Sequence, residues 1–427
     1  MHEPLFLIRA LTLATGLGGC LLPAPALTLP AALQRVLQEH PEVRMQQMNV
    51  RVAEQDQDIA RQQFFPTPSV SLEQAQTGHG DVQYQGADRV TYLRLQQPLW
   101  TGGRLTAGLD KAQSQMKMRQ AMLEETRLQL AVNTVQAWGD WCAALARTAA
   151  VDRNLQQHSA LLERVARRVE EGAASQAEWV MTDGRVAQVQ AQLRTQQSQA
   201  RAALNRLVQL LGEPVSETDP TFDSLSLALP SEMGLISQQA LGSSPTLARL
   251  RAQLEIVEQE VKERQAETVP ELYLRAEHQR GNFSVANSPN TNRVFIGLTS
   301  RFGAGLSSLK QVDATLRRKE AAGFEIDSSQ RRLEEQVQTL WIQLQEIEAR
   351  LPSLARNLSA NQATLQAWDR QFLAGRKSWL DVMNAARELM QAEIDMADAR
   401  VNQQSLQWRL ALWAHGPDAL LSQAQPK

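Results

Sequence analysis

The chain has 427 residues and carries 44 lysines and arginines against 46 aspartates and glutamates, a formal net charge of -2. This balance argues against a nucleic-acid-binding protein, which usually carries a basic excess. Its two cysteines, Cys20 and Cys142, are too few for a disulfide framework or a multi-cysteine zinc site. Only 5% of the residues are aromatic, whereas Gln, Ala, Arg, Leu and Glu are abundant. Such a composition is typical of long helices.

The N-terminus is predicted to be an export signal. Residues 10–22 are apolar and small, and a run this short cannot cross a bilayer as a helix, which takes about 20 residues. The run fits the central region of a secretory signal that is cleaved after Ala26, so 1–26 is predicted as the signal peptide. The alternative is a lipoprotein signal with Cys20 as the acylated residue. In both cases the mature chain is exported, and Cys142 is predicted to be a buried packing residue of a helix.

The exported chain divides into two repeats, 27–211 and 233–415, with a linker at 212–232 and a tail at 416–427. Four landmarks recur in the same order at a spacing of 202 to 204 residues, which indicates a duplicated unit. The linker is rich in Pro, Ser, Asp and Glu, as loops between units commonly are. The matched pairs are Pro41 with Pro245, Pro66 with Pro270, Trp100 with Phe302, and Gly172 with Gly375.

Each repeat is predicted to begin with a helix, at about 31–64 in the first and 233–267 in the second. A proline ends the helix, because the residue before proline disfavours the helical conformation. A β-hairpin around a polar loop follows, at 69–97 and at 271–301. In the second hairpin apolar residues occupy alternate positions, which gives each strand one apolar and one more polar face.

A very long helical stretch follows each hairpin, at about 105–170 and 306–371. Each would measure about 100 Å at 1.5 Å per residue. Apolar residues recur three and four positions apart along these stretches, which is the pattern of a coiled-coil seam. Helices this long cannot fold into a globule, so their seams must pack on neighbouring helices. Breaks at Gly172 and Gly375 separate them from return helices, which are predicted at about 177–211 and 379–415.

The four predicted strands indicate an oligomer. Four strands cannot close a barrel, and open sheet edges are not tolerated in lipid. Bacterial outer-membrane barrels have at least eight strands, and three copies of this chain would supply twelve. The long helices would then continue the ring as a helical tube. The alternative is a periplasmic structural coiled-coil or adhesion protein with surface hairpins. An enzyme is a third class, which no motif or metal-ligand spacing favours.

Four segments carry a family resemblance: 40–56, 64–73, 95–113 and 372–400. The third contains a pattern that is specific for a strand-to-helix junction, Gln97-Pro98-Leu99-Trp100 followed by Gly102-Gly103-Arg104. With these segments the chain resembles the TolC family of outer-membrane channel proteins. The resemblance covers essentially the whole mature chain.

This resemblance implies an α+β membrane protein. Its helices form a long antiparallel coiled-coil barrel, and its four strands join those of two other copies in a trimeric 12-stranded β-barrel. The homotrimer would sit in the lipid of the Gram-negative outer membrane, with its tunnel in the periplasm. The implied partners are a periplasmic adaptor (membrane fusion) protein and an inner-membrane ABC transporter or proton-driven pump. No catalysis, cofactor, metal or nucleic acid is expected.

The favoured function is the exit duct of a tripartite export system for type I protein secretion, including secretion of large adhesins. The stretch 95–108 and the short linker look most like the corresponding segments of channels that serve type I secretion. The alternative is the outer-membrane component of a multidrug or small-molecule efflux pump. A periplasmic structural coiled-coil protein is the remote alternative. Cargo is normally chosen by the inner-membrane transporter, so this chain need not encode it.

The resemblance also implies a periplasmic gate beside the glycine breaks Gly172 and Gly375. Lys377 occupies the family's basic position, and Asp381 occupies the acidic position six residues after the glycine. In the first repeat Glu178 lies six residues after its glycine. Three copies of each acid would face a narrow axis and favour cations. Lys377 would bridge Glu178 or Asp381 between neighbouring helices and hold the closed state; alternatively, Lys377 and Asp381 form a simple i,i+4 pair on a solvated helix.

The chain departs from the family pattern at two gate positions. Phe372 stands where the closest relatives usually have Tyr, so the bond made by that hydroxyl is absent. Asn384 stands at the last acidic position, so one acidic ring is missing. Away from the gate, Gly102 and Gly103 are predicted to form the strand-to-helix junction.

Overall fold

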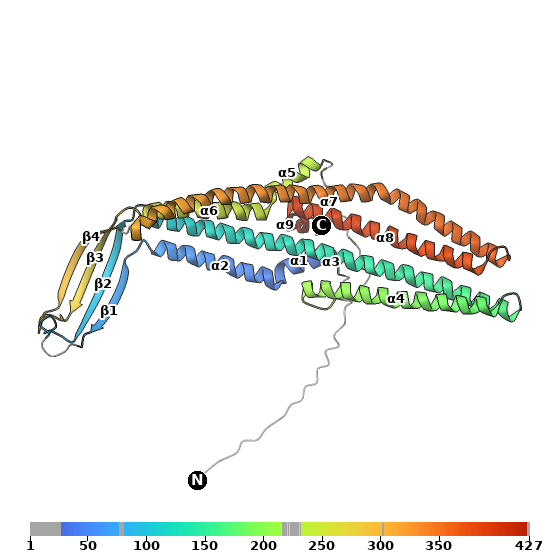
Figure 1. The fold of residues 1–427 in the computed structure, drawn as a ribbon, viewed down its shortest axis with the longest axis horizontal. Helices are drawn as coiled ribbons and strands as arrows, with labels where there is room; N and C mark the ends of the chain where they lie inside the picture. The colour runs from blue at the N-terminus through green and yellow to red at the C-terminus, as the bar shows by residue number, and fades with distance from the viewer. Residues whose placement is uncertain are drawn as a thin grey trace, which may run out of the picture.

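A computed structural model describes residues 27–76, 81–215, 220, 222, 230, 232–300 and 303–424. The described part is an elongated rod, with a β-sheet at one end and two helical hairpins reaching the other (Figure 1). The predicted signal peptide at 1–26, the alternative acylation site Cys20 and most of the predicted linker at 212–232 lie outside the described residues.

Each half of the chain begins with two helices, whereas the sequence predicted one. The predictions of single helices at 31–64 and 233–267 are wrong, because His40 and Ser244 precede prolines and adopt extended ψ angles of 134° and 114°. Each of these residues then caps the next helix, which begins with proline at a position that needs no backbone N–H. The helices are α1 (Leu29–Glu39) and α2 (Pro41–Gln62), then α5 (Met233–Ser243) and α6 (Pro245–Ala266).

The four predicted strands are confirmed, and they lie within three residues of the predicted hairpin limits. They are β1 (Thr67–Gln74), β2 (Arg89–Trp100), β3 (Glu271–Arg280) and β4 (Thr291–Thr299). The predicted long helices and return helices are also present. They are α3 (Arg104–Glu170), α4 (Gln176–Leu211), α7 (Ser307–Leu373) and α8 (Trp379–His415), and a short helix, α9 (Pro417–Ala424), follows.

The strands form one antiparallel sheet in the order β1-β2-β3-β4, with β1 and β4 at its edges. The register aligns apolar side chains on one face of the sheet, where Val70 is paired with Leu93 and Leu274 with Ile296. Val70 and Ile296 are more than 70% exposed in the single chain. A soluble protein rarely exposes a contiguous apolar surface of this kind, so this face is made for an apolar environment.

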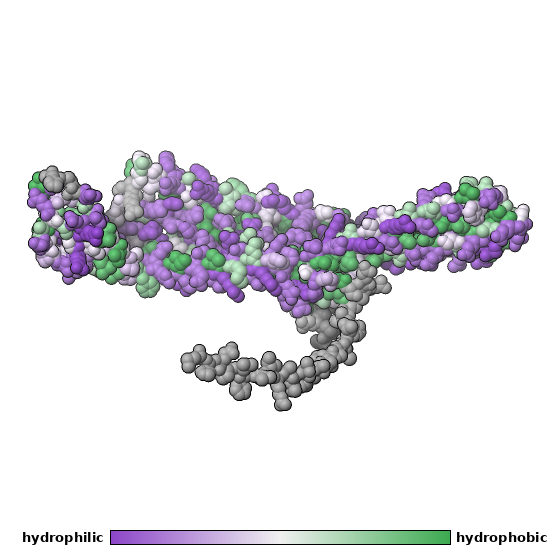
Figure 2. Space-filling model, turned by 90° about the horizontal axis from the view of Figure 1, so that it is seen from below, coloured by the Kyte–Doolittle hydropathy of each residue, from purple (hydrophilic) through white to green (hydrophobic). Residues whose placement is uncertain are grey.

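The helices lie side by side along the rod, in one order near the sheet and in another toward the far end (Figure 1). Near the sheet their order is α2, α3, α6, α7, and toward the far end it is α4, α3, α8, α7. One edge of the helical layer is therefore formed by α2 and α4, and the other by α7. Figure 2 shows mostly hydrophilic side chains along this helical layer, with a stripe of hydrophobic ones along the narrow end opposite the sheet.

The largest core lies midway along the rod, around the fully buried side chains of Trp138, Leu207 and Leu412. Cys142 belongs to this core, which confirms the prediction of a buried packing cysteine. A second core joins α5 and α6 to α7 and α8, and a third lies close to the far end. Within the described ranges, none of the helices combines the length and apolar character that a membrane crossing requires.

Candidate functional site

The two helical hairpins turn in the same way at the far end of the rod. Gly172 and Gly375 have φ angles of 69° and 71°, in the left-handed region that favours glycine. The N–H of Gly172 donates to the carbonyl of Val169, and that of Gly375 to Phe372, each at 3.0 Å. These bonds satisfy carbonyls that the ends of α3 and α7 would otherwise leave unpaired. Both predicted tip glycines therefore lie at the tips.

The two predicted gate acids each close a capping box, which sequence reasoning missed. The N–H of Glu178 donates to Ser175 Oγ at 3.2 Å, and the N–H of Ser175 donates to Glu178 Oε2 at 2.9 Å. Asp381 and Ser378 make the equivalent bonds, both at 3.2 Å. The signal was present, because a serine followed three residues later by an acid marks the start of a helix.

Lys377 contacts two groups of its own chain. Its Nζ lies 3.8 Å from Asp381 Oδ2 and 4.2 Å from the ring centroid of Trp368. The hydrogen bonds from Ser378 to the Asp381 carboxylate, with the nearby Lys377 charge as a smaller cause, lower the pKa of Asp381 below its ordinary value. Within one chain Lys377 and Asp381 thus form an i,i+4 pair. Glu178 has no ion pair within the described part of the chain.

The hairpin ends are held together by a small core and by charged contacts. Phe372 is 3% exposed and packs with residues of α3 and α8, and the guanidinium of Arg168 lies 5.1 Å from its ring centroid. Arg164 of α3 pairs with Asp369 of α7. The phenyl ring at this position is therefore buried inside the chain, with no hydroxyl to reach a neighbour.

At the opposite end of the helices, Gly102 and Gly103 form the junction between β2 and α3. Their φ angles are 61° and 90°. A Cβ on Gly102 would approach the Cβ of Val269 to 3.2 Å, so both space and conformation favour glycine there. Gly103 has nothing within 4 Å, and its requirement is conformational alone. The predicted junction residues are therefore placed where the sequence motif indicated.

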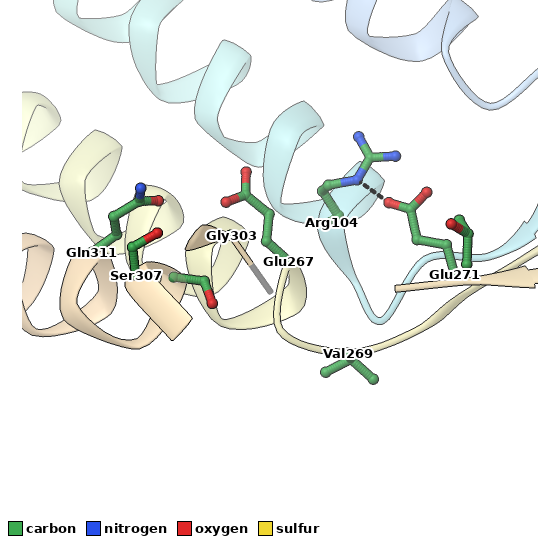
Figure 3. A pocket seen from close by; sticks show the side chains of 9 residues that line it. Arg104, Glu267, Val269, Glu271, Gly303, Ser307 and Gln311 are labelled. Carbon is green, nitrogen blue, oxygen red and sulfur yellow. Dashed lines mark hydrogen bonds and ion pairs between the residues drawn. The ribbon is translucent and has the colours of Figure 1, made fainter. Parts of the chain in front are cut away.

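A cavity of about 470 Å³ opens beside this junction (Figure 3). Arg104, the first residue of α3, donates from Nε to Glu271 Oε1 of β3 at 2.6 Å across one side of it. Glu267 and Gln311 line the other side. The ion pair joins the start of α3 to the start of β3.

The second face of the sheet is polar. Arg94 Nε donates to Glu277 Oε2 at 2.7 Å between β2 and β3. Glu277 is 9% exposed although it carries a charge. A sheet with one apolar and one polar face has the pattern of a transmembrane barrel wall around water.

Comparison with known proteins agrees with this geometry. A family model described as outer membrane efflux protein matches residues 32–213 and 236–414. The alkaline protease secretion protein AprF of Pseudomonas aeruginosa is 24% identical over 257 residues, which cover 58% of this chain and 53% of that protein. The outer membrane efflux protein BepC of Brucella suis is 20% identical over 378 residues, 87% of this chain and 82% of that protein.

Solved structures share the fold at low sequence identity. The outer-membrane channel OprN has a TM-score of 0.78 at 19% identity, with 91% of this chain and 90% of that one covered. The outer membrane protein VceC of Vibrio cholerae has a TM-score of 0.77 at 17% identity, with 91% and 96% covered. The helices and the sheet therefore have counterparts along most of both molecules.

Proposed function

The chain belongs to the outer membrane efflux protein family, and we propose that three copies of it form the exit duct of a tripartite export system. It is an outer-membrane protein of an export channel family. We also propose that the two halves of the chain, 27–211 and 233–415, are copies of one structural repeat.

The observation that carries the proposal is the order of strands and helices across the chain. The edge with β1 also has α2 and α4, and the edge with β4 also has α7. If β4 of one copy pairs with β1 of the next, the open backbone groups of both edges are satisfied and the contact is head-to-tail. Three such contacts close a ring of twelve strands. The closed barrel exposes no unpaired strand edge to the lipid.

Exposed apolar side chains on the helices support the same contacts. Met45 and Val52 of α2 are 53% and 58% exposed, and Phe324 of α7 is 73% exposed. They lie on helices at opposite edges of the layer. Burying them between copies would remove apolar area from water. Each Å² of that area stabilises the contact by about 25 cal/mol.

We propose type I protein secretion as the cargo class, including large adhesins. Its support is the similarity to a protein named for alkaline protease secretion. The partners would then be a periplasmic adaptor and an inner-membrane ABC transporter. Efflux of drugs or small molecules with a proton-driven pump is the second candidate, supported by the similarity to BepC, which covers more of the chain. No step of either function needs catalysis by this chain.

The gate is proposed at the far end of the helices. Three copies of the Gly172 and Gly375 turns would meet there around the axis. Asp381 and Glu178 would form acidic rings, and Lys377 would hold the closed state. Its intrachain contacts to Asp381 and Trp368 indicate how the lysine is positioned before it meets a neighbouring chain.

Deletion of the gene in its own host tests the cargo class. The set of secreted proteins and the sensitivity to dyes and antibiotics are measured together, with complementation by the wild-type gene as control. Loss of one or a few secreted proteins at unchanged drug sensitivity supports type I secretion. Drug hypersensitivity with an intact set of secreted proteins would instead establish efflux. Outer-membrane fractionation and migration as a heat-resistant trimer test the assembly itself.

A further inference from the structure

We propose that the polar face of the sheet carries an anion-binding belt, made by Arg94, Arg275 and Arg293, that binds carboxylate-rich polypeptide segments inside the barrel. The inference rests on the proposed function, because this face lines the lumen only if three copies close the barrel with their apolar faces outward. It goes beyond that function by giving the membrane part of the duct a charge preference of its own.

The strand register brings two of these arginines to either side of one carboxylate. Arg94 of β2 is paired with Glu277 of β3, which is paired with Arg293 of β4. Side chains at directly opposite positions on one face lie about 4.5–5.5 Å apart at their Cβ atoms. The row continues to Ser69 of β1, which is uncharged. One carboxylate therefore stands between two guanidiniums, and the row keeps one positive charge.

The neighbouring row, toward the helices, contains the third arginine and no acid. It consists of Thr67, Gln96, Arg275 and Phe295. The guanidinium of Arg275 lies 4.7 Å from the ring centroid of Phe295. This stacking orients the cation without neutralising it.

Arg275 also has an unused donor. Its Nε is buried, and no hydrogen-bond partner for it is present among the described residues. A buried donor without a partner costs free energy. The Arg275 side chain as a whole is only partly buried, so an acceptor in the lumen would bond the terminal nitrogens of its guanidinium. Arginine is suited to this task because its planar guanidinium matches a carboxylate with two parallel hydrogen bonds.

The other acids of the polar face do not cancel the belt. Glu271 is paired with Arg104 at 2.6 Å. Glu73 lies at the loop end of β1, away from the row of Arg275. Three guanidiniums and one carboxylate thus occupy the two rows, which leaves two positive charges per chain and six in a trimer. A lumen with walls of low dielectric constant concentrates the field of such a ring.

The chain offers a matched control on the opposite face of the same strand. Arg89 begins β2, and the register places it with Gln74 on the side of Leu93. Its Nε donates to Gln74 Oε1 at 3.2 Å. Arg89→Gln removes one arginine from β2, the strand that also carries Arg94, and leaves the three arginines of the belt in place.

Binding of fluorescent poly-L-glutamate to the purified full-length trimer in detergent tests the proposal. The sheet lies at the end of the rod opposite the proposed gate, so poly-L-glutamate can enter the barrel from that end even when the gate is closed. We expect R275Q/R293Q to raise the dissociation constant at least about tenfold, because each lost charge-assisted contact weakens binding. R89Q should leave it unchanged. R275Q alone, with a smaller loss, serves if the double variant fails to fold.

Equal affinity of wild type and folded R275Q/R293Q for poly-L-glutamate would overturn the belt. Equal loss in R89Q and in the belt variants would also overturn it, because the effect would then be one of overall charge. Light scattering on the same samples separates this result from failure of the proposed function. A wild-type protein that is monomeric at the concentrations used would contradict the closed barrel, whatever its affinity for the polyanion.

Discussion

Asn154 of α3 donates a hydrogen bond from Nδ2 to the backbone carbonyl of Ala386 in α8, over 3.0 Å. The amide is 1% exposed. It lies in an interface between helices from different halves of the chain, where a polar side chain is costly unless it is bonded. The bond therefore fixes one lateral and axial position of α8 against α3, at a level between the midpoint and the hairpin ends.

Asn154→Ala should destabilise this interface. The variant loses the hydrogen bond and leaves a small cavity, and together these cost about 1–3 kcal/mol. Thermal unfolding of the purified protein measures the loss. Asn133→Ala on the exposed side of the same helix is the control. Equal melting temperatures of the two variants would show that the Asn154 bond contributes little.

The tip glycines should tolerate alanine poorly. Gly172→Ala and Gly375→Ala place a Cβ on residues with φ near +70°, which costs about 1–2 kcal/mol for each turn. Gly184 lies inside α4 with open space around it, so Gly184→Ala should be neutral or stabilise by up to about 1 kcal/mol. Limited proteolysis at the tips and thermal unfolding report the difference. The same response in all three variants would contradict a conformational role for the turns.

The Cys142 thiol should be inert in the folded protein. Burial raises its pKa to about 12, so almost no thiolate is present at neutral or mildly alkaline pH. Maleimide labelling at pH 8 should be slow for the native protein and fast after denaturation, as followed by mass spectrometry. Rapid labelling of the native protein would mean that α3 opens in its middle.

The elements of the fold followed from local patterns, whereas their partners did not. Alternation with period two predicted the strands, and proline and glycine marked their ends. The rule that ends a helix before Pro66 applies equally before Pro41 and Pro245, where it separates α1 from α2 and α5 from α6. The Arg94–Glu277 pair joins residues 183 positions apart, and no local pattern contains the register that pairs them. The capping boxes at Glu178 and Asp381 are local signals, because each acid follows a serine by three residues.

Neutralising the proposed gate should open it. In the proposed trimer, Asp381→Asn would remove three acids from the axis and Lys377→Ala would remove the cation that pairs with them, so each should increase single-channel conductance in planar bilayers. Asp381→Asn should also lower the preference for cations. Glu346→Gln, on the exposed side of α7, removes an acid away from the tips and is the control. Conductance that matches wild type in both tip variants would remove these residues from the gate.

Acidification should loosen the tip through Asp381. Because the folded-state pKa of Asp381 is lowered, its contribution to stability is complete above the ordinary aspartate pKa of about 3.9 and is lost as the pH falls through the lowered value. Protonation weakens the hydrogen bonds that Ser378 donates to this carboxylate and removes the negative charge that faces Lys377. Conductance of the wild type should therefore stay constant from pH 7 to pH 5 and rise only below about pH 4. Asp381→Asn/Glu178→Gln should show no such rise, since neither amide titrates. A rise near pH 6 in both proteins would assign the transition to a histidine instead.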